Sequence, residues 1–231
     1  MSFAVHRDAW LSEVMARPVF RVDGTGATDD LAAHVRDQRN GFYFAKVATD
    51  QVTDVRALSR HGFAVVDTSV TFELAREVPV ATAIEVSECT PADAEAVLAI
   101  AGSAFRYSRF HLDPTVGVEL ANHVKRVWIR NYVTKQRGDA LLVAHHAGKP
   151  AGFLAALVAH GTAVIDLVAV ATDAHGHGIG SALCAAFAKR YHDKPRIVGT
   201  QVANVPSIRM YTKLGYELSR SQYVLHLHAG T

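Results

Sequence analysis

The stretch that decides the fold is Ala163–Ala188, AVIDLVAVATDAHGHGIGSALCAAFA. It opens on an apolar run rich in Val and Ile, Val164–Val170, which indicates a strand buried on both faces. Alternate glycines follow, and from Ile179 onward apolar residues recur at helical spacing. A strand, a glycine loop and a helix N-terminus in this order predict an anion site, because free backbone N–H groups point outward where the helix dipole is positive.

The loop reads His175-Gly176-His177-Gly178-Ile179-Gly180 and is followed by Ser181. It resembles the pyrophosphate loop of the GNAT superfamily of N-acetyltransferases, usually written Q/R-x-x-G-x-G/A, with His175 in place of the family's Arg or Gln. Two alternatives are a tight turn that binds nothing and a dinucleotide fingerprint. The fingerprint needs an acidic residue about twenty positions on, at the end of the next strand. Asp193 comes before that strand, which disfavours the dinucleotide alternative.

Two further stretches carry the resemblance. Thr200–Glu217, TQVANVPSIRMYTKLGYE, is similar to the superfamily's Asn-x-x-Ala/Ser-x-x-x-Tyr-x-x-x-Gly-Phe/Tyr segment. Ala104–Pro114, AFRYSRFHLDP, lies where the superfamily builds its acceptor site. With a degenerate N-terminal half, the pattern looks most like the TDP-fucosamine acetyltransferases, bacterial enzymes that acetylate the 4-amino group of a nucleotide-linked dideoxy sugar.

The resemblance implies an α/β protein with the mixed-sheet GNAT acyl-CoA N-acyltransferase fold, whose catalytic domain spans residues 84–231. Residues 1–80 are interpreted as a truncated, degenerate GNAT-like half. A shift of 153 lays Arg56–Leu74 over Arg209–Leu227 without a gap, but puts Thr25, Ala27 and Leu58 where Gly178, Gly180 and Tyr211 stand. The alternative is an unrelated α/β cap. We expect residues 63–74 to form a hairpin or two strands, and residues 216–219 and 222–228 to form a pair.

Acetyl-CoA is the cosubstrate that the resemblance implies, with no metal. Residues 175–181 would hold its pyrophosphate, and the backbone of Val168, Ala169 and Val170 its pantetheine arm, since a neighbouring strand that splays away leaves those groups unpaired. Asn204, Ser207 and Tyr211 would complete this site.

Three residues are catalytic candidates. Tyr211 would be the general acid for the leaving thiolate; the alternative is a packed tyrosine. Asp166, the ionisable residue of its apolar strand, would accept the amine proton, or else would pair with a nearby His or Arg. Asn204 would contact ligand or water, or would only cap the helix that follows.

The acceptor would be a small-molecule amine. Arg109, Phe110 and His111 are expected to bind it, with the two basic residues gripping an acidic group such as a nucleotide diphosphate; a solvated loop is the alternative. A protein N-terminal or amino-acid acetyltransferase and a non-catalytic CoA sensor remain as other functions. Tyr211 and Asn204 disfavour the sensor.

Composition narrows the classes further. The chain has 231 residues, a formal net charge of +2 and two cysteines. It therefore shows no basic stripe for nucleic acid, no disulfide framework, and no apolar run long enough for a membrane. His226 and His228 share a strand face, but no third ligand type stands beside them in sequence, which argues against a metal site. We expect a cytoplasmic protein, and a homodimer is compatible with the sequence.

Overall fold

Ten strands pair edge to edge in the computed structural model, which describes residues 3–24 and 28–230. Their order in this mixed sheet is β1-β2-β3-β10-β4-β9-β8-β7-β6-β5. The strands are β1 (Ala4–Arg7), β2 (Val19–Asp23), β3 (Phe42–Ala48), β4 (Ala64–Leu74), β5 (Glu85–Glu88), β6 (Ala140–His146), β7 (Lys149–Ala159), β8 (Thr162–Val170), β9 (Arg196–Gln201) and β10 (Tyr216–His228). The helices are α1 (Ala9–Val14), α2 (Thr28–Asp37), α3 (Val52–Arg60), α4 (Ala94–Ala101), α5 (Val118–Val133), α6 (Ile179–Arg190) and α7 (Val205–Lys213).

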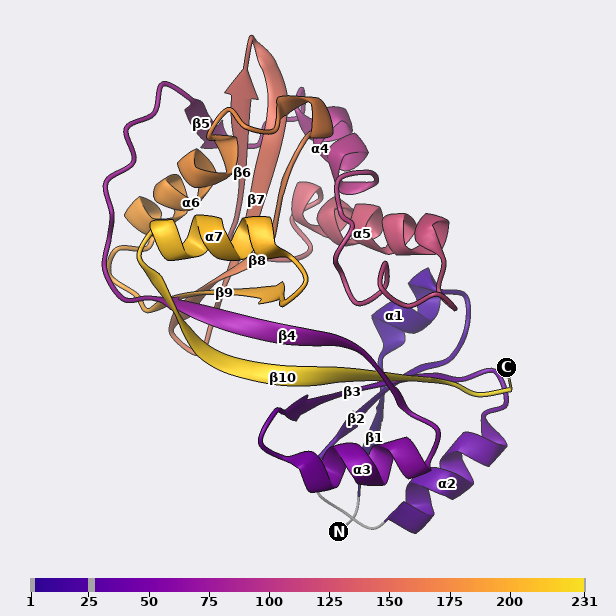
Figure 1. Cartoon of the computed structure of the whole chain (residues 1–231). Helices are drawn as coiled ribbons and strands as arrows, with labels where there is room; N and C mark the ends of the chain where they lie inside the picture. The colour runs from indigo at the N-terminus through magenta and orange to yellow at the C-terminus, as the bar shows by residue number, and fades with distance from the viewer. Residues whose placement is uncertain (1–2, 25–27, 231) are drawn as a thin grey trace.

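The two long strands β4 and β10 cross the middle of the molecule and join its two halves (Figure 1). β4 belongs to the first half of the sequence, yet it pairs with β9 of the second half. β10 ends the second half, yet it pairs with β3 of the first. Each half therefore completes its part of the sheet with the other half's terminal strand. The expected domain boundary at residues 80–84 stays a prediction. In the structure, β4 and β10 each pair with a strand from the other side of this boundary.

The sequence repeat coincides with element boundaries. The shift of 153 carries α3, Val52–Arg60, onto the bounds of α7, Val205–Lys213. It also carries β3 onto residues 195–201, where β9 spans Arg196–Gln201. Thr25 and Ala27, which the repeat aligns with the loop glycines, lie outside the described residues.

Two expectations about strands are wrong. Residues 64–74 form one strand, β4, rather than a hairpin, and residues 216–228 form one strand, β10, rather than a pair. Register irregularities in the β4–β10 ladder, one of them between Leu218 and Arg220, let the strand continue past the polar stretch that suggested a turn. β1 and α1 were not expected at all, because they are too short for a clear periodic pattern.

A β-bulge at Asp166 reverses the side-chain alternation of β8. Ala155 and Ala156 of β7 face Leu167 and Ile165, so that Asp166 has no partner in the ladder. Before the bulge, Ala163 and Ile165 pack in the cluster that α6 and α7 cover. Beyond it, Leu167 and Ala169 pack in the cluster under α4 and α5. Because of the extra residue, side chains that follow Asp166 in β8 point to the opposite side of the sheet from the side that the alternation before it would give them.

The remaining core lies under the first half. β3 alternates between two clusters: Tyr43 and Ala45 pack with α2 and α3, whereas Phe42 and Phe44 pack with α1, α5 and the loop before α5. This second cluster is shared between the halves, since Leu11 of α1 and Val124 of α5 belong to it.

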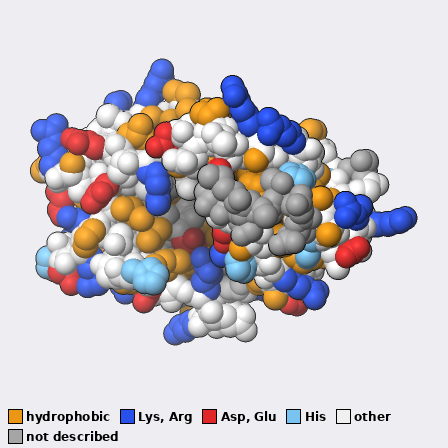
Figure 2. Space-filling view, turned by 90° about the horizontal axis from the view of Figure 1, so that it is seen from below, with side chains coloured by type: hydrophobic (Ala, Val, Ile, Leu, Met, Phe, Trp, Pro, Cys, Tyr) orange, Lys and Arg blue, Asp and Glu red, His pale blue; other side chains and the backbone are white. Residues whose placement is uncertain are grey.

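Figure 2 shows one face of the molecule, on which side chains of both charges are interspersed. None of the helices in the described part of the chain has the length and apolar character needed to span a bilayer.

Gly215, at the start of β10, provides a test of the junction between the halves. Its φ is +87°, and an added Cβ would lie 2.0 Å from the carbonyl oxygen of Arg76, just beyond β4. We expect Gly215→Ala to lower the free energy of unfolding by much more than the roughly 1–2 kcal/mol of left-handed strain alone. Gly148→Ala is the matched control, because Gly148 has φ +74° with no atom within 4 Å. Equal losses in chemical denaturation would contradict a tight junction.

Candidate active site

A cleft opens where β8 leaves β9. The parallel ladder between them holds three pairs, ending at Ile165 and Val198, and the bulge at Asp166 follows at once. β8 continues to Val170 along β7, so its other edge faces an open space of about 880 Å³. Val168, Ala169 and Val170 line this cleft, where the sequence predicts a splayed strand.

The glycine loop closes one end of the cleft. Gly176 and Gly178 have φ of +85° and +76°, and an added Cβ on either would meet no atom within 4 Å. The first hydrogen bond at the start of α6 runs from Ala182 N–H to the carbonyl of Gly178, so the three preceding amides have no partner in the helix. A pyrophosphate fits this open, amide-lined helix end. His175, Ile179, Gly180 and Ser181 also line the cleft, whereas His177 stacks on His146.

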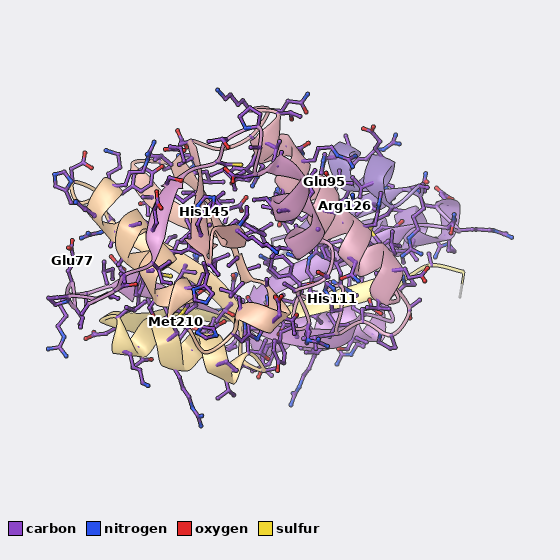
Figure 3. The ribbon with its side chains drawn as sticks, turned by 90° about the horizontal axis from the view of Figure 1, so that it is seen from above. Glu77, Glu95, His111, Arg126, His145 and Met210 are labelled. Atoms are coloured by element: carbon purple, nitrogen blue, oxygen red, sulfur yellow. The ribbon has the colours of Figure 1, made fainter. Side chains whose placement is uncertain are left out.

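Gly180 has a packing role of its own. Its added Cβ would lie 2.8 Å from Met210 Sδ, on α7. Met210 is labelled in Figure 3 and lines the cleft. Gly180 thus allows α6 and α7 to approach each other, besides belonging to the loop.

Tyr211 faces the cleft from α7. Its ring is 2% exposed and packs 6.1 Å from Phe72 and 5.7 Å from Tyr216, measured between ring centroids. The hydroxyl has no hydrogen-bond partner among the described residues. Burial, followed by Cys184 and Tyr216, raises its pKa well above the usual value, so the phenol keeps its proton at neutral pH. A protonated, unpartnered hydroxyl beside β8 is able to donate.

Asn204 caps α7, which is the alternative that the sequence left open. Its Oδ1 accepts a hydrogen bond of 3.4 Å from Ser207 N–H, and its Nδ2 donates to Thr200 Oγ1 at 3.2 Å. Asn204 and Ser207 both line the cleft, so contact with a ligand stays a prediction.

Asp166 is held by three donors, and this arrangement argues against its predicted role as the base. Its Oδ2 accepts hydrogen bonds from Trp128 Nε1 at 2.8 Å, Tyr132 Oη at 2.7 Å and Arg137 Nε at 2.9 Å. Arg137 also forms an ion pair with it, which matches the alternative of a structural aspartate. The oxygen that would have to accept the amine proton is therefore already occupied by three donors.

A second cavity of about 800 Å³ extends the cleft into the first half of the chain. The two spaces share Lys46, Arg109, Trp128 and Gln222. The second cavity adds residues from α1, β2 and β3 of the first half: Trp10, Arg21 and Phe44. The acceptor end of the cleft is therefore built by both halves.

This end is cationic. Lys46, Arg109, Lys125 and Arg220 line the connected spaces and make no ion pair among the described residues. Three acidic groups nearby are already engaged: Asp166 with Arg137, Asp23 with Arg21 at 2.6 Å, and Asp8 as the N-cap of α1. Asp67 of β4 also lies within electrostatic reach of Lys46, but burial raises its pKa to about 6 and both of its carboxylate oxygens are inaccessible. An anion would supply the missing counter-charge.

The three predicted acceptor residues differ in position. Arg109 lines both spaces, with its guanidinium 4.0 Å from the centroid of the Phe44 ring and 4.3 Å from that of Phe110. Burial lowers the pKa of Arg109 to about 10, a value that still leaves it charged at neutral pH. Phe110 is 1% exposed and belongs to the shared core under the cleft.

His111 does not reach the cleft. Its Nδ1 lies 2.6 Å from Ser108 Oγ and its Nε2 lies 3.0 Å from Asn122 Oδ1, so both ring nitrogens are engaged. Burial lowers its pKa, which favours the neutral ring. His111 lies beside α5 (Figure 3) and fixes the loop rather than gripping a ligand.

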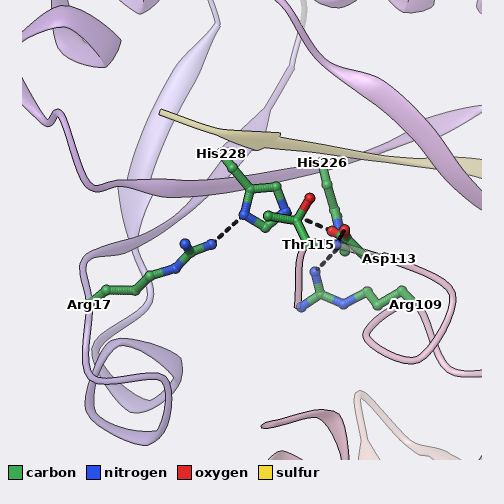
Figure 4. Close-up of polar contacts among 6 residues, drawn as sticks. All are labelled: Arg17, Arg109, Asp113, Thr115, His226 and His228. Atoms are coloured by element: carbon green, nitrogen blue, oxygen red, sulfur yellow. Dashed lines mark hydrogen bonds and ion pairs between the residues drawn. The ribbon is translucent and has the colours of Figure 1, made fainter. Parts of the chain in front are cut away.

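Arg109 belongs to a buried network that the sequence did not reveal (Figure 4). Asp113 Oδ2 lies 2.6 Å from His226 Nδ1 and 2.7 Å from His228 Nε2. Arg109 donates to His226 Nε2 at 3.1 Å, and Arg17 donates to His228 Nδ1 at 2.5 Å. The remaining Asp113 oxygen accepts from Thr115 N–H. This network of hydrogen bonds thus connects β10 to the loop that carries Arg109.

The same network corrects one step of the metal argument. Asp113 is a third ligand type beside His226 and His228, with the three ligand atoms within 4.8 Å of one another. The fold brings it from more than a hundred residues away, so sequence spacing could not show it. Both histidines are hydrogen-bonded to Asp113, and one guanidinium group is hydrogen-bonded to each ring, an environment that disfavours a cation.

Residues 104–216 match a family model described as the acetyltransferase (GNAT) family. They contain the cleft strand β8, the glycine loop and α7. This part of the chain belongs to the GNAT family. The expected fold class, a GNAT-type mixed sheet, is confirmed.

Individual relatives agree. The spore coat polysaccharide biosynthesis protein SpsD of Bacillus subtilis (strain 168) is 33% identical over 143 residues, which cover 61% of this chain and 49% of SpsD. The chain therefore spans about half the length of this curated relative. A GCN5-related N-acetyltransferase structure from Sphaerobacter thermophilus matches with a TM-score of 0.69 and 12% identity, covering 99% of this chain and 77% of its own. A tandem GNAT protein from the clavulanic acid biosynthesis pathway matches with a TM-score of 0.63 and 17% identity, covering 100% and 80%. At such low sequence identity, the similarity to these two structures is evidence for the fold of this chain and for nothing more.

Sequence reasoning missed several residues of this GNAT cleft. The sequence predicts a strand around Lys46 and a helix around Lys125 and Trp128, but it gives none of these residues a place in a binding site. Trp128 and Tyr132 are four residues apart on α5, as are Lys125 and Ile129, so a helical-wheel reading could place them on one face. Nothing in the sequence shows that this face meets Asp166.

Two variants of Gly178 that differ in charge but hardly in side-chain size test the loop. We expect Gly178→Asp to weaken acetyl-CoA binding by about a hundredfold or more, because like charges brought together cost several kcal/mol. Gly178→Asn is the matched control, since both side chains face the same strain at φ +76°. Isothermal titration calorimetry measures both. Equal affinities for the two variants would show that no phosphate sits there.

Proposed function

We propose that the protein is an acetyl-CoA-dependent N-acetyltransferase whose acceptor is the primary amine of a nucleotide-linked amino sugar. The observation that carries this proposal is the connected cleft. One end is an amide-lined glycine loop at the start of α6, and the other end holds cations without acidic partners beside tryptophan rings. The polysaccharide relative, by its printed name, supports a sugar acceptor.

The two ends suit two different anions. The loop amides at Ile179, Gly180 and Ser181 would bind the cosubstrate pyrophosphate, and the open edge of β8 would take its pantetheine arm. Lys46, Arg109 and Arg220 would bind the diphosphate of the acceptor. Trp10 and Trp128, whose ring centroids lie 5.4 Å apart, offer apolar surface for the base or sugar.

The reaction follows from this placement. Bound acetyl-CoA supplies the acetyl group as a thioester. The two binding regions hold the amine beside the acetyl carbon, and such positioning alone supplies much of the rate. Tyr211 Oη donates a proton to the sulfur as the C–S bond breaks, which its retained proton and its position on the cleft wall allow.

Tyr211→Phe tests the general acid, because it keeps the ring and removes only the hydroxyl. We expect kcat to fall about a hundredfold or more, as is typical when a general acid is lost. Acetyl-CoA affinity and melting temperature should change little, since the hydroxyl makes no hydrogen bond within the described structure. Steady-state kinetics and calorimetry on the same preparation separate these effects. A variant with wild-type kcat would end the assignment.

The acceptor class is tested with amino-sugar nucleotides, free amino sugars, amino acids and peptides in a thiol-release assay. We expect turnover only with the nucleotide-linked sugars. Lys46→Gln should raise their KM at least tenfold while leaving the acetyl-CoA KM unchanged, because one charge-assisted hydrogen bond is worth about 1.5–3 kcal/mol. Lys149→Gln, in the exposed β6–β7 turn, is the control. Turnover on peptides alone would overturn the sugar proposal.

A further inference from the structure

Lys125 is an unusual lysine for the wall of a cleft. It lies on α5 and is 7% exposed, yet it lines the space between β8 and the cationic end. Its Nζ lies 4.9 Å from the centroid of the Trp128 ring and 5.0 Å from that of Phe105. Among the described residues it makes neither a hydrogen bond nor an ion pair. The two ring faces attract a cation, but a buried ammonium without a hydrogen-bond partner is costly, so burial lowers the proton affinity of this amine.

The surroundings act in the same direction. Burial is the main cause that lowers the pKa of Lys125, to about 7. Arg109 from the preceding loop and Lys46 from β3 lower it further, whereas Asp166 on β8 opposes them. His111, the other titratable neighbour, is neutral because burial lowers its own pKa. The carboxylate of Asp166 is itself held by Arg137, which limits its effect on the lysine.

We propose that Lys125 is the general base that removes the ammonium proton from the bound acceptor amine. This inference rests on the proposed N-acetyltransferase function and adds a residue to it. Lys125 Nζ, as a neutral amine, takes the proton of the acceptor ammonium and becomes an ammonium itself. The freed nitrogen lone pair forms the C–N bond and the C–S bond breaks. The nitrogen loses a second proton as the amide forms, and that proton replaces the one that Tyr211 gives to sulfur. Lys125 then returns its proton to solvent.

Two other groups fit this role less well. Asp67 on β4 has a pKa raised to about 6 by burial, but both of its carboxylate oxygens are inaccessible, so no substrate can touch them. Asp166 lines the cleft but its Oδ2 already accepts three hydrogen bonds. Lys125 combines access to the cleft with an unpartnered nitrogen.

The titration of Lys125 can be followed directly in the full-length protein. Lysines labelled with ¹³C at Cε are observed by NMR across a pH series, and the Lys125 resonance is the one missing from Lys125→Met. We expect it to titrate near pH 7, whereas exposed lysines titrate near 10.4. A Lys125 resonance that titrates with the exposed lysines would overturn the proposal.

Two substitutions then separate a base from a simple positive charge. Lys125→Arg keeps the charge but cannot give up its proton, and Lys125→Met keeps only the apolar stem. With the acceptor found above, we expect both to lower kcat about a hundredfold or more. Both should also remove the rise of kcat/KM with pH through about 7, and neither should change acetyl-CoA affinity. Lys189→Arg, on the exposed end of α6, is the matched control.

The outcomes are distinct. If Lys125→Arg keeps wild-type kcat while Lys125→Met only raises the acceptor KM, Lys125 is an anion-binding cation and the proposal is wrong. If wild-type protein transfers acetyl groups to none of the amines tested, the proposed function fails and this inference with it. An active wild type with an inactive Lys125→Arg that still binds acetyl-CoA supports both.

Discussion

The carboxylate of Asp166 fixes the geometry on which the cleft depends. It stands at the bulge where β8 leaves β9, and its Oδ2 accepts hydrogen bonds from Trp128, Tyr132 and Arg137. These donors lie on α5 and just beyond it, so one oxygen holds the helix against the strand. A carboxylate of which only 13% is exposed requires such partners, since an unpaired charge there would be strongly destabilising. The bulge, the open edge of β8 and the position of α5 are therefore consequences of one interaction.

The pairing of β4 and β10 with strands of the opposite half makes the first half part of the sheet that carries the cleft. Neither half can complete its part of the sheet alone, because each terminal strand pairs within the other half. The first half also builds one wall of the cleft, where β3 supplies Lys46 and Phe44. The first half therefore contributes both to the sheet and to the acceptor end.

The sequence predicted the parts of the fold and site that are local. Val164–Val170, the loop glycines and the helix from Ile179 follow one another in the chain, so their patterns identify β8, the glycine loop and α6 directly. The shift of 153 that the sequence shows also carries the bounds of α3 onto those of α7. Of the cations at the acceptor end the sequence predicted only Arg109, since Lys46 and Lys125 come from segments that lie apart from it in the chain. The role of Asp166 was undecided for the same reason: its partners lie 29 to 38 residues away. Long-range polar contacts have no periodic signature.

The electrostatics of the acceptor end connect binding to chemistry. In the free protein, burial lowers the pKa of Lys125 to about 7, and the positive charges of Arg109 and Lys46 act in the same direction. A diphosphate bound to Lys46 and Arg109 would screen those charges and would attract a proton to Lys125. With this pKa, a large share of Lys125 is neutral at neutral pH and able to accept a proton before the acceptor arrives, and the lysine becomes a stronger base once the acceptor's negative charge lies beside it. An uncharged amine of similar size would bring no such change. Selectivity for an anionic acceptor would then arise in proton transfer as well as in binding, from one cluster of cations.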